Sequence, residues 1–271
     1  MITLTLKEQP TVPLEAESIS PDVMADLGHD AVRALPVYLG KRRRRLDDFF
    51  EVAGASSDEL ELRGDLSRVK WIGRGMTRGR VTVVGSAGMH LGSSMKGGTI
   101  EVTGDVTDWL GAEMKGGLIR VRGSAGGQVG AAYRGSPRGM NQGTILVEGS
   151  AGIEVGMRMR RGIIAVGGRV RDFAGLQMKG GTIFLLGGAE IRTGAWMARG
   201  TIVSLAPIHL LPTFSYACTY QPAFLRLYVR HLRALGFAIP PEAGDGPYQR
   251  YAGDASGLGK GEILMPALSG A

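Results

Sequence analysis

Positively charged side chains recur at one place in a repeated pattern, and they are the residues best suited to bind a charged ligand. Each lies between a methionine and the glycine that follows it by three residues. Six of seven copies carry such a cation, and we call the set the basic row: Arg78, Lys96, Lys115, Arg160, Arg161, Lys179 and Arg199. Like charges stacked at the ~4.8 Å spacing of strands repel by ~1 kcal/mol even in water. The basic row is therefore either a solvated stripe whose long side chains splay apart or a track for a polyanion.

No arrangement of residues in the sequence is typical of an active site or a metal site. A hydrolase needs a nucleophile or a metal with an oriented base, and no Ser–His–Asp or Cys–His constellation has supporting spacing. The one cysteine, Cys218, excludes a cysteine-ligated zinc or iron–sulfur site, and the four histidines share no metal-binding spacing. The recurring methionines lack cysteine or histidine beside them, so they are better explained as adaptable packing residues than as Cu(I) ligands. We predict no catalytic residue, no metal and no cofactor bound by this chain.

The pattern that carries the basic row has a regular length. Its methionines are spaced by 19 residues, except for one interval of 26 that contains a seven-residue insertion around Arg134 to Gly139. They are Met76, Met95, Met114, Met140, Met159, Met178 and Met197. A 19-residue period is too short for a pair of helices and too long for a heptad.

The residues after each repeated glycine alternate between apolar and other types. Alternation with period two predicts strands with one buried face, for example at Ile100/Val102 and Ile119/Val121. A column of small residues that includes Ala87 marks a second short strand. Two short strands and glycine turns per repeat describe one coil, so the sequence predicts an all-β, single-stranded β-helix of about seven 19-residue coils. A phosphate-binding loop would need a helix after the glycines, where strands follow here.

Three regions follow from the position of the repeat. We expect the β-helix solenoid at 58–206, an N-terminal appendage at 1–57 and a C-terminal cap at 207–271, because the ends of a solenoid expose unpaired strand edges. The appendage is expected to contain a strand at 1–6 and a short helix at 21–27. Its run Lys41 to Arg45 is either a solvated loop or a contact with an anion. In the cap, apolar residues at helical spacing predict an amphipathic helix at 225–235.

The outward side of the predicted main strands becomes apolar along the solenoid, although a solvent-facing strand should be polar there. The outward apolar residues are Leu118, Leu146, Ile163, Ala165, Phe184 and Val203. We therefore expect a cover on this face, provided by the helix at 225–235, by a sister subunit, or by both.

Composition excludes several classes of protein. The 271 residues include 44 glycines, but glycine does not recur every third residue as in collagen, and a hydrophobic content of 44% argues against disorder. The formal net charge is +7, of which the run Lys41 to Arg45 alone supplies +5. No apolar stretch reaches the ~20 residues that span a bilayer, and the N-terminus lacks the form of a signal peptide. We expect a cytoplasmic protein that does not contact a membrane.

Segments outside the repeat add to a family resemblance. Together with the repeat, the sequences at 35–37, 46–54, 224–236, 251–254 and 257–264 resemble the C subunit of formylmethanofuran dehydrogenase, a member of the GXGXG β-helix family. The C-terminal domain of the glutamate synthase large subunit has a similar repeat, but it lies at the end of a far longer chain. The resemblance covers nearly the whole sequence, least at 1–30, and it implies that the β-helix is right-handed.

The resemblance implies two alternative settings. In methylotrophic bacteria, a formyltransferase/hydrolase complex moves a formyl group from tetrahydromethanopterin to a methanofuran-type carrier and hydrolyses it to formate. In methanogens, a tungsten- or molybdenum-dependent formylmethanofuran dehydrogenase fixes CO₂ on methanofuran. Arginine far outnumbers lysine here, which favours a GC-rich bacterial genome and hence the first setting in one-carbon metabolism.

In both settings the resemblance implies a non-catalytic scaffold subunit, with the chemistry in sister subunits. In the bacterial complex these are an amidohydrolase-like chain and a formyltransferase chain. The family's carriers have a glutamate-rich tail, so polyglutamate is the natural polyanion for the basic row. Nucleic acid is a rival polyanion, but no aromatic residues alternate with the cations, and we predict no nucleic-acid binding. A stand-alone β-helix binding protein is the remaining alternative.

Overall fold

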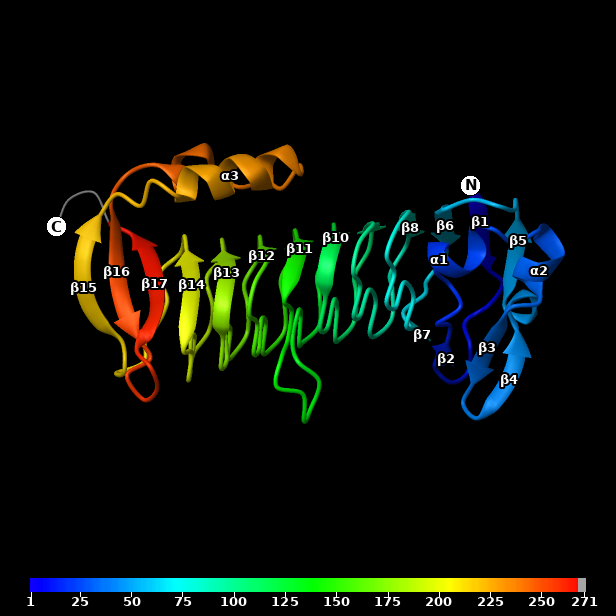
Figure 1. The fold of residues 1–271 in the computed structure, drawn as a ribbon, viewed down its shortest axis with the longest axis horizontal. Helices are drawn as coiled ribbons and strands as arrows, with labels where there is room; N and C mark the ends of the chain where they lie inside the picture. The colour runs from blue at the N-terminus through cyan, green and yellow to red at the C-terminus, as the bar shows by residue number, and fades with distance from the viewer. Residues whose placement is uncertain (268–271) are drawn as a thin grey trace.

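Strands dominate the structure, a computed structural model that describes residues 1–267 (Figure 1). Thirteen strands form one long sheet, in the order β15-β16-β17-β14-β13-β12-β11-β10-β9-β8-β6-β1-β5. Four more form a smaller sheet, in the order β4-β3-β2-β7. The helices are few and short by comparison. The prediction of an all-β fold is confirmed.

Strands of the repeated region stack in the order of the sequence. They are β6 (Glu59–Arg63), β8 (Arg80–Val84), β9 (Thr99–Val102), β10 (Lys115–Val121), β11 (Gln142–Val147), β12 (Ile163–Val166), β13 (Lys179–Leu185) and β14 (Arg199–Ser204). Each pairs in parallel with the strand of the next repeat, so that Ile100 lies opposite Ile119 and Ile145 opposite Ile164. We call residues 59–204 the repeat stack, which forms the long middle of the molecule (Figure 1).

The repeated methionines pack inside the stack and explain the glycines that follow them. All seven methionines of the pattern are 0% exposed. Gly98 has a φ of +80°, and a Cβ there would lie 2.5 Å from Met76 Cε and 2.8 Å from Gly79 O. Only a residue without a side chain fits such a close approach in this backbone conformation.

The second strand of each repeat is shorter than predicted. The column of small residues forms a single bridge from one repeat to the next, for example between Ala87 and Val106. Gly85 and Gly88 stand close on either side of Ala87, and glycine weakens the interior of a strand. Each repeat therefore contains one strand and one bridge rather than two strands.

The N-terminal residues extend the long sheet and build the small one. In the long sheet, β1 (Ile2–Leu6) pairs in parallel with β6, and β5 (Phe50–Ala53) pairs antiparallel with β1 at the edge. The small sheet consists of β2 (Leu14–Glu15), β3 (Pro36–Leu39), β4 (Arg42–Arg45) and β7 (Val69–Lys70). The short helices of this region are α1 (Pro21–Met24), α2 (His29–Arg33) and η1 (Leu46–Asp48).

Two expectations for these residues need correction. The helix expected at 21–27 is confined to α1. The run Lys41 to Arg45 is not the solvated loop that was one of its two interpretations, because Arg42–Arg45 form the exposed edge strand β4 and Lys41 lies in the turn before it. A turn at Gly40, with a φ of +60°, reverses the chain direction. The strand β4 therefore pairs antiparallel with β3, with Arg42 opposite Leu39 and Arg45 opposite Pro36. Backbone hydrogen bonds to β3 thus override the high local charge.

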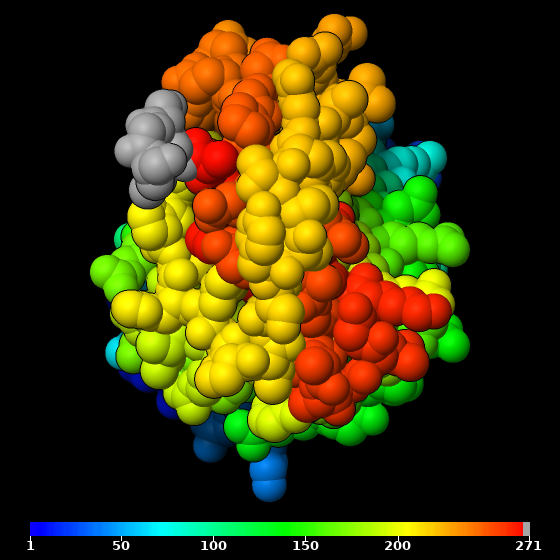
Figure 2. All heavy atoms as spheres, turned by 90° about the vertical axis from the view of Figure 1, so that its left-hand side faces the viewer, coloured from blue at the N-terminus to red at the C-terminus, as the bar shows by residue number. Residues whose placement is uncertain are grey.

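The C-terminal residues continue the sheet beyond the last repeat. β17 (Lys260–Pro266) pairs in parallel with β14, and β16 (Tyr248–Gly253) and β15 (Ser215–Tyr220) follow in antiparallel order. Figure 2 looks onto this end of the molecule, where the yellow segment that contains β15 crosses the middle of the face. The helices here are α3 (Leu225–Ala234), which confirms the expected amphipathic helix, and η2 (Pro241–Gly244).

The apolar outer face of the long sheet is covered by α3 (Figure 1). Leu146, Ala165, Phe184 and Val203 are fully buried in one cluster with three helix residues: Leu225, Val229 and Leu232. This contact provides the helical cover expected from the sequence. Among residues 1–267, no helix has both the length and the apolar character needed to cross a membrane.

Candidate functional site

The basic row lies along one corner of the repeat stack, where turns lead into the parallel strands. Lys115, Lys179 and Arg199 are the first residues of β10, β13 and β14. Lys179 lies opposite Arg199, and Arg199 lies opposite Lys260 of β17, so three cations follow one another on neighbouring strands. Lys260 does not follow from the repeat pattern because it lies outside the repeat, although a Lys–Gly pair before a strand was the available signal.

Most cations of the row have no carboxylate partner in the described residues 1–267. Arg78 is an exception, since its Nη2 lies 3.4 Å from Asp26 Oδ2. Nε of Arg160 is buried without a hydrogen-bond partner. Nζ of Lys179 donates to the carbonyl oxygen of Pro137 at 3.4 Å. Beyond Arg78, the row therefore keeps its positive charge available to attract anions.

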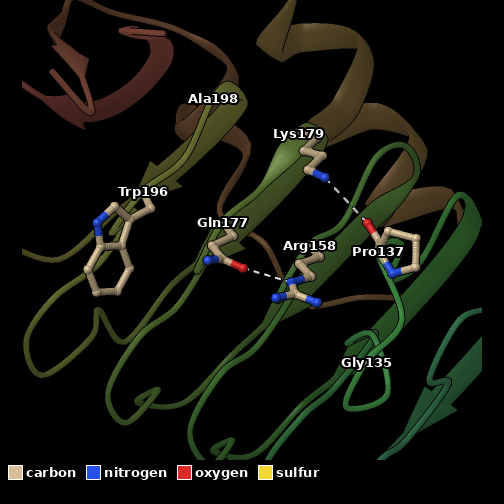
Figure 3. A pocket seen from close by; sticks show the side chains of 7 residues that line it. All are labelled: Gly135, Pro137, Arg158, Gln177, Lys179, Trp196 and Ala198. Atoms are coloured by element: carbon tan, nitrogen blue, oxygen red, sulfur yellow. Dashed lines mark hydrogen bonds between the residues drawn. The ribbon is translucent and has the colours of Figure 1, made fainter. Parts of the chain in front are cut away.

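A groove of about 560 Å³ opens beside the C-terminal half of the row (Figure 3). It is lined by Gly135, Pro137, Arg158, Gln177, Lys179, Trp196 and Ala198, and we call it the insertion groove. Arg158 donates from Nε to Gln177 Oε1 at 2.7 Å and from Nη1 to Ser136 O at 2.6 Å. The lining contains two cations and no carboxylate. It can bind and orient an anion, but none of its residues is a nucleophile with an adjacent base.

Of the basic row, only Lys179 lines this groove; the sequence did not single out Arg158, Gln177 or Trp196. Each of these three residues directly precedes a repeated methionine and has a left-handed backbone, with φ between 53° and 56°. Sequence propensity assigns positive φ to glycine, which is why this column was overlooked. The available signal was a polar or aromatic residue at one fixed position of consecutive repeats.

The described residues do not suggest a metal centre. In residues 1–267, no three His, Cys, Asp or Glu side chains are grouped so that they could hold a metal ion. The donors that are available at the insertion groove are cationic or neutral, which suits an anionic ligand rather than a metal.

An aromatic cluster at another corner was also missed. Trp71 stacks on His90 with 4.0 Å between ring centroids, Trp109 stacks on Tyr133 at 4.9 Å, and His90 Nδ1 lies 3.0 Å from Tyr133 Oη. Burial lowers the pKa of His90 to about 4, and the positive charge of Lys70 adds to this effect. Burial likewise raises the pKa of Tyr133 to about 12. Both rings are therefore neutral near pH 7, which makes His90 a packing residue.

Fold and surface together define a class: a glycine-rich protein of stacked parallel strands with a carboxylate-free basic groove. A family model described as the GXGXG motif matches residues 62–208. The C subunit of the formyltransferase/hydrolase complex Fhc from Methylorubrum extorquens is 44% identical over 267 residues, which cover 98% of this chain and 100% of that protein. The chain belongs to the GXGXG-motif family and, within it, to the family of the Fhc C subunit, and it is homologous to the C subunits of formylmethanofuran dehydrogenases.

A solved structure supports the same assignment. The crystal structure of the formyltransferase/hydrolase complex (FhcABCD) from Methylorubrum extorquens with methylofuran contains a chain that matches with a TM-score of 0.90 and 33% identity. The match covers 98% of this chain and 100% of that one.

The C subunits of formylmethanofuran dehydrogenases match over a shorter segment. The one from the molybdenum-containing enzyme 1 of Methanothermobacter marburgensis is 45% identical over 83 residues, or 30% of this chain. The one from the tungsten-containing enzyme 2 of Methanothermobacter thermautotrophicus is 43% identical over 97 residues, or 34% of this chain. The matched segments span only 21% and 36% of those relatives' own lengths.

Proposed function

We propose that this chain is the C subunit of a formyltransferase/hydrolase complex in bacterial one-carbon metabolism. That complex transfers a formyl group from tetrahydromethanopterin to a methanofuran-type carrier and hydrolyses it to formate. The similarity to the Fhc protein over 98% of the chain, with a TM-score of 0.90, carries the proposal. The C subunit of a tungsten or molybdenum formylmethanofuran dehydrogenase is the second candidate, because those proteins match over at most 34% of the chain.

Within the complex we assign a scaffold role to this protein, with no catalytic step of its own. Its sister subunits would be an amidohydrolase-like chain and a formyltransferase chain in the cytoplasm. The insertion groove supports this role, since its lining can hold a charged group but has no nucleophile–base pair. A scaffold with a charged surface can keep a carrier close to two separate catalytic centres.

The architecture we propose for this scaffold is a single-stranded, right-handed β-helix of about seven coils at 58–206. Parallel pairing between strands 19 residues apart, such as Ile100 with Ile119, supports one coil per repeat. The appendage at 1–57 and the cap at 207–271 would close its two ends, since open strand edges invite association.

The basic row is proposed to hold the glutamate-rich tail of the carrier. Lys96, Lys115 and Lys179 are exposed and have no carboxylate partner in the described part of the chain. A flexible polyanion would neutralise the repulsion between neighbouring cations and would be held more weakly at high salt.

Isolation of the assembled complex tests the assignment. The chain, tagged in its native host, should copurify with an amidohydrolase-like and a formyltransferase chain, without tungsten or molybdenum in metal analysis. Native mass spectrometry would give the stoichiometry. Tungsten or molybdenum with iron–sulfur subunits would move the assignment to the dehydrogenase, and a lone chain or homo-oligomer would refute both.

Removal of positive charges tests whether the basic row holds the tail of the carrier. Lys96→Gln/Lys115→Gln/Lys179→Gln should weaken carrier binding to the complex at least about tenfold at low salt, since each lost cation is worth about 0.5–1 kcal/mol. The matched control removes the same charge elsewhere on the stack, as Arg122→Gln/Arg169→Gln/Arg171→Gln, and should keep full affinity. Unchanged affinity of the lysine variant, with folding intact by circular dichroism, would exclude the track.

A further inference from the structure

The last strand of the long sheet, β15 (Ser215–Tyr220), has one edge with which no other strand of residues 1–267 pairs. Its other edge pairs with β16. Residues 215–219 are exposed, and the strand contains neither a charged residue nor a proline. The segment lies across the surface at this end of the molecule (Figure 2). Such an edge offers a row of backbone N–H and C=O groups to a further strand.

The other three sheet edges within the described residues are protected. At the far end of the long sheet, α2 packs against β5, and His29 Nδ1 lies 3.1 Å from Gly54 O just after that strand. In the small sheet, β4 consists of four arginines, and charge discourages pairing at an edge. The two-residue strand β7 is followed by Trp71, whose N–H donates to Met89 O of the next repeat at 3.1 Å. β15 therefore stands out as the unprotected edge.

Apolar side chains near β15 add surface that a partner can bury. Tyr216, on the strand itself, is 57% exposed. Phe224 and Leu227, which follow at the start of α3, are 36% and 67% exposed. Aromatic side chains are enriched at protein–protein interfaces, and charged residues are depleted from their centres. The surroundings of the open edge thus have the composition of an interface.

The strand suits a second copy of itself. Because β15 is uncharged, two copies can lie side by side without the repulsion between like charges that would oppose the pairing of two β4 edges. Identical edges related by a two-fold axis run antiparallel, and such a contact closes at two copies. Head-to-tail growth would instead require the β5 edge, against which α2 packs.

We propose that two copies of this chain associate through their β15 edges and so join their long sheets into one sheet across a two-fold axis. Backbone hydrogen bonds between the two strands supply the contact, and the apolar side chains around Tyr216 pack beside it. The partner is a second copy of the chain rather than a strand of a different protein. The inference concerns contact between copies and does not rest on the proposed function.

Chemical cross-linking through Cys218 tests the contact. Cys218 is exposed, lies near the middle of β15 and is the single cysteine of the chain. Opposite residues of antiparallel strands have Cα atoms ~4.5–5.5 Å apart, so a short bismaleimide should join two copies, both in the full chain alone and in the assembled complex. The control Cys218→Ser/Ala238→Cys moves the thiol to an exposed position after α3 and should give no linked dimer. Absence of a linked wild-type dimer, or linkage of Cys218 to a different polypeptide, would overturn the proposal.

A charge at the edge should weaken the association. Ala217 is exposed and its methyl group makes no hydrogen bond, so Ala217→Lys removes none within the chain. Sedimentation velocity should show a dimer of the wild-type chain and a dissociation constant at least about tenfold higher for the variant. Ala238→Lys adds the same charge away from the edge and should associate as the wild type does. A monomeric wild-type chain, or a folded Ala217→Lys variant that dimerises equally well, would contradict the proposal.

A mixture of charge variants identifies the partner as a second copy. Ala217→Glu alone should also dimerise weakly, because two carboxylates then lie near the two-fold axis. Mixed with Ala217→Lys, it should form dimers again, since opposite charges on paired strands attract. A mixture that stays monomeric would show that the two β15 edges do not face each other.

Cross-linking of material purified from the native host separates this inference from the proposed function. A complex that contains the sister subunits but gives no dimer linked at Cys218 refutes the inference alone. A linked dimer in a preparation without sister subunits refutes the proposed function and leaves the inference standing.

Discussion

The two halves of the repeat stack share one interior but differ on the outer face of the long sheet. In the first half, outward residues Thr82 of β8 and Glu101 of β9 keep part of their surface in solvent. In the second half, Ala165 of β12 and Phe184 of β13 are 0% exposed, because α3 covers them. A common repeat length therefore fixes the interior, while one outward position per strand determines what packs outside.

The first half has its own reinforcement at a turn corner. Trp71, His90 and Trp109 occupy one position of three successive repeats, and their rings stack. In the next two repeats the same position holds Gln128 and Glu154, which form a hydrogen bond of 2.8 Å instead. The two halves are thus stabilised at different places. Aromatic stacking between repeats stabilises the first half, and docking of α3 on the outer face stabilises the second.

The largest difference between the halves is expected from truncation of outward side chains. Phe184→Ala should lower the free energy of unfolding by ~3–5 kcal/mol, because it leaves a cavity beneath α3. Thr82→Ala, at the corresponding position of the uncovered half, should change it by less than ~0.5 kcal/mol. Urea denaturation of both variants measures the contrast, and similar losses would show that the two outer faces are equivalent.

The border between the halves is held by Arg120 of β10. Its guanidinium donates to the carbonyl oxygens of Leu235 and Gly236 at 3.2 and 2.6 Å and pairs with Glu148 at 2.6 Å. Arg120→Met should therefore cost ~1–3 kcal/mol and loosen the end of α3, since charged hydrogen bonds are lost. Hydrogen exchange of the α3 amides measures the loosening.

Arg122 provides the matched control for this border. It pairs with the same carboxylate at 2.9 Å, but its side chain is 51% exposed against 14% for Arg120. Arg122→Met should leave α3 exchange unchanged. Equally accelerated hydrogen exchange of α3 in both variants would mean that α3 is loosened by the lost ion pair with Glu148, rather than by the lost hydrogen bonds from Arg120 to the end of the helix.

The aromatic corner predicts a pH dependence for the first half. Burial lowers the pKa of His90 from its ordinary 6.5 to about 4, so the folded state binds fewer protons than the unfolded chain. The folding stability associated with a neutral His90 is fully present above about pH 6.5 and is lost as the pH falls toward 4. His90 keeps some solvent contact, so we expect a loss of ~1–2 kcal/mol. Wild type should lose this much more stability between pH 7 and 4 than His90→Phe, whereas exposed His231→Phe should behave as wild type.

Periodicity in the sequence was sufficient to predict the main strand of each repeat, the buried methionines and the cover of the outer face. Each of these depends on residue types at fixed spacing: the alternation at Ile100 and Val102 predicts a strand, and apolar residues such as Phe184 at outward positions predict a cover. The helical spacing at 225–235 then supplied the element that covers them.

Contacts between repeats could not be predicted in the same way. The insertion groove forms only when Ser136 and Pro137 meet side chains of two later repeats. The stack of Trp71 on His90 requires a left-handed backbone at both residues, which sequence propensity assigns to glycine. Whether the basic row binds a polyanion stays a prediction.

The smallest effect is expected for an ion pair on the part of the outer face that α3 leaves uncovered. Arg80 Nη1 lies 2.6 Å from Glu101 Oε1 across β8 and β9, but the two side chains are 50% and 40% exposed. A double-mutant cycle with Arg80→Gln and Glu101→Gln should give a coupling of at most ~0.5–1 kcal/mol, which shrinks in high salt, because water screens exposed pairs. The half-buried Arg120–Glu148 pair, measured the same way, should couple more strongly and respond less to salt. Equal coupling energies would mean that α3 does not shield its half of the face, and the difference between the two halves would then rest on apolar packing alone.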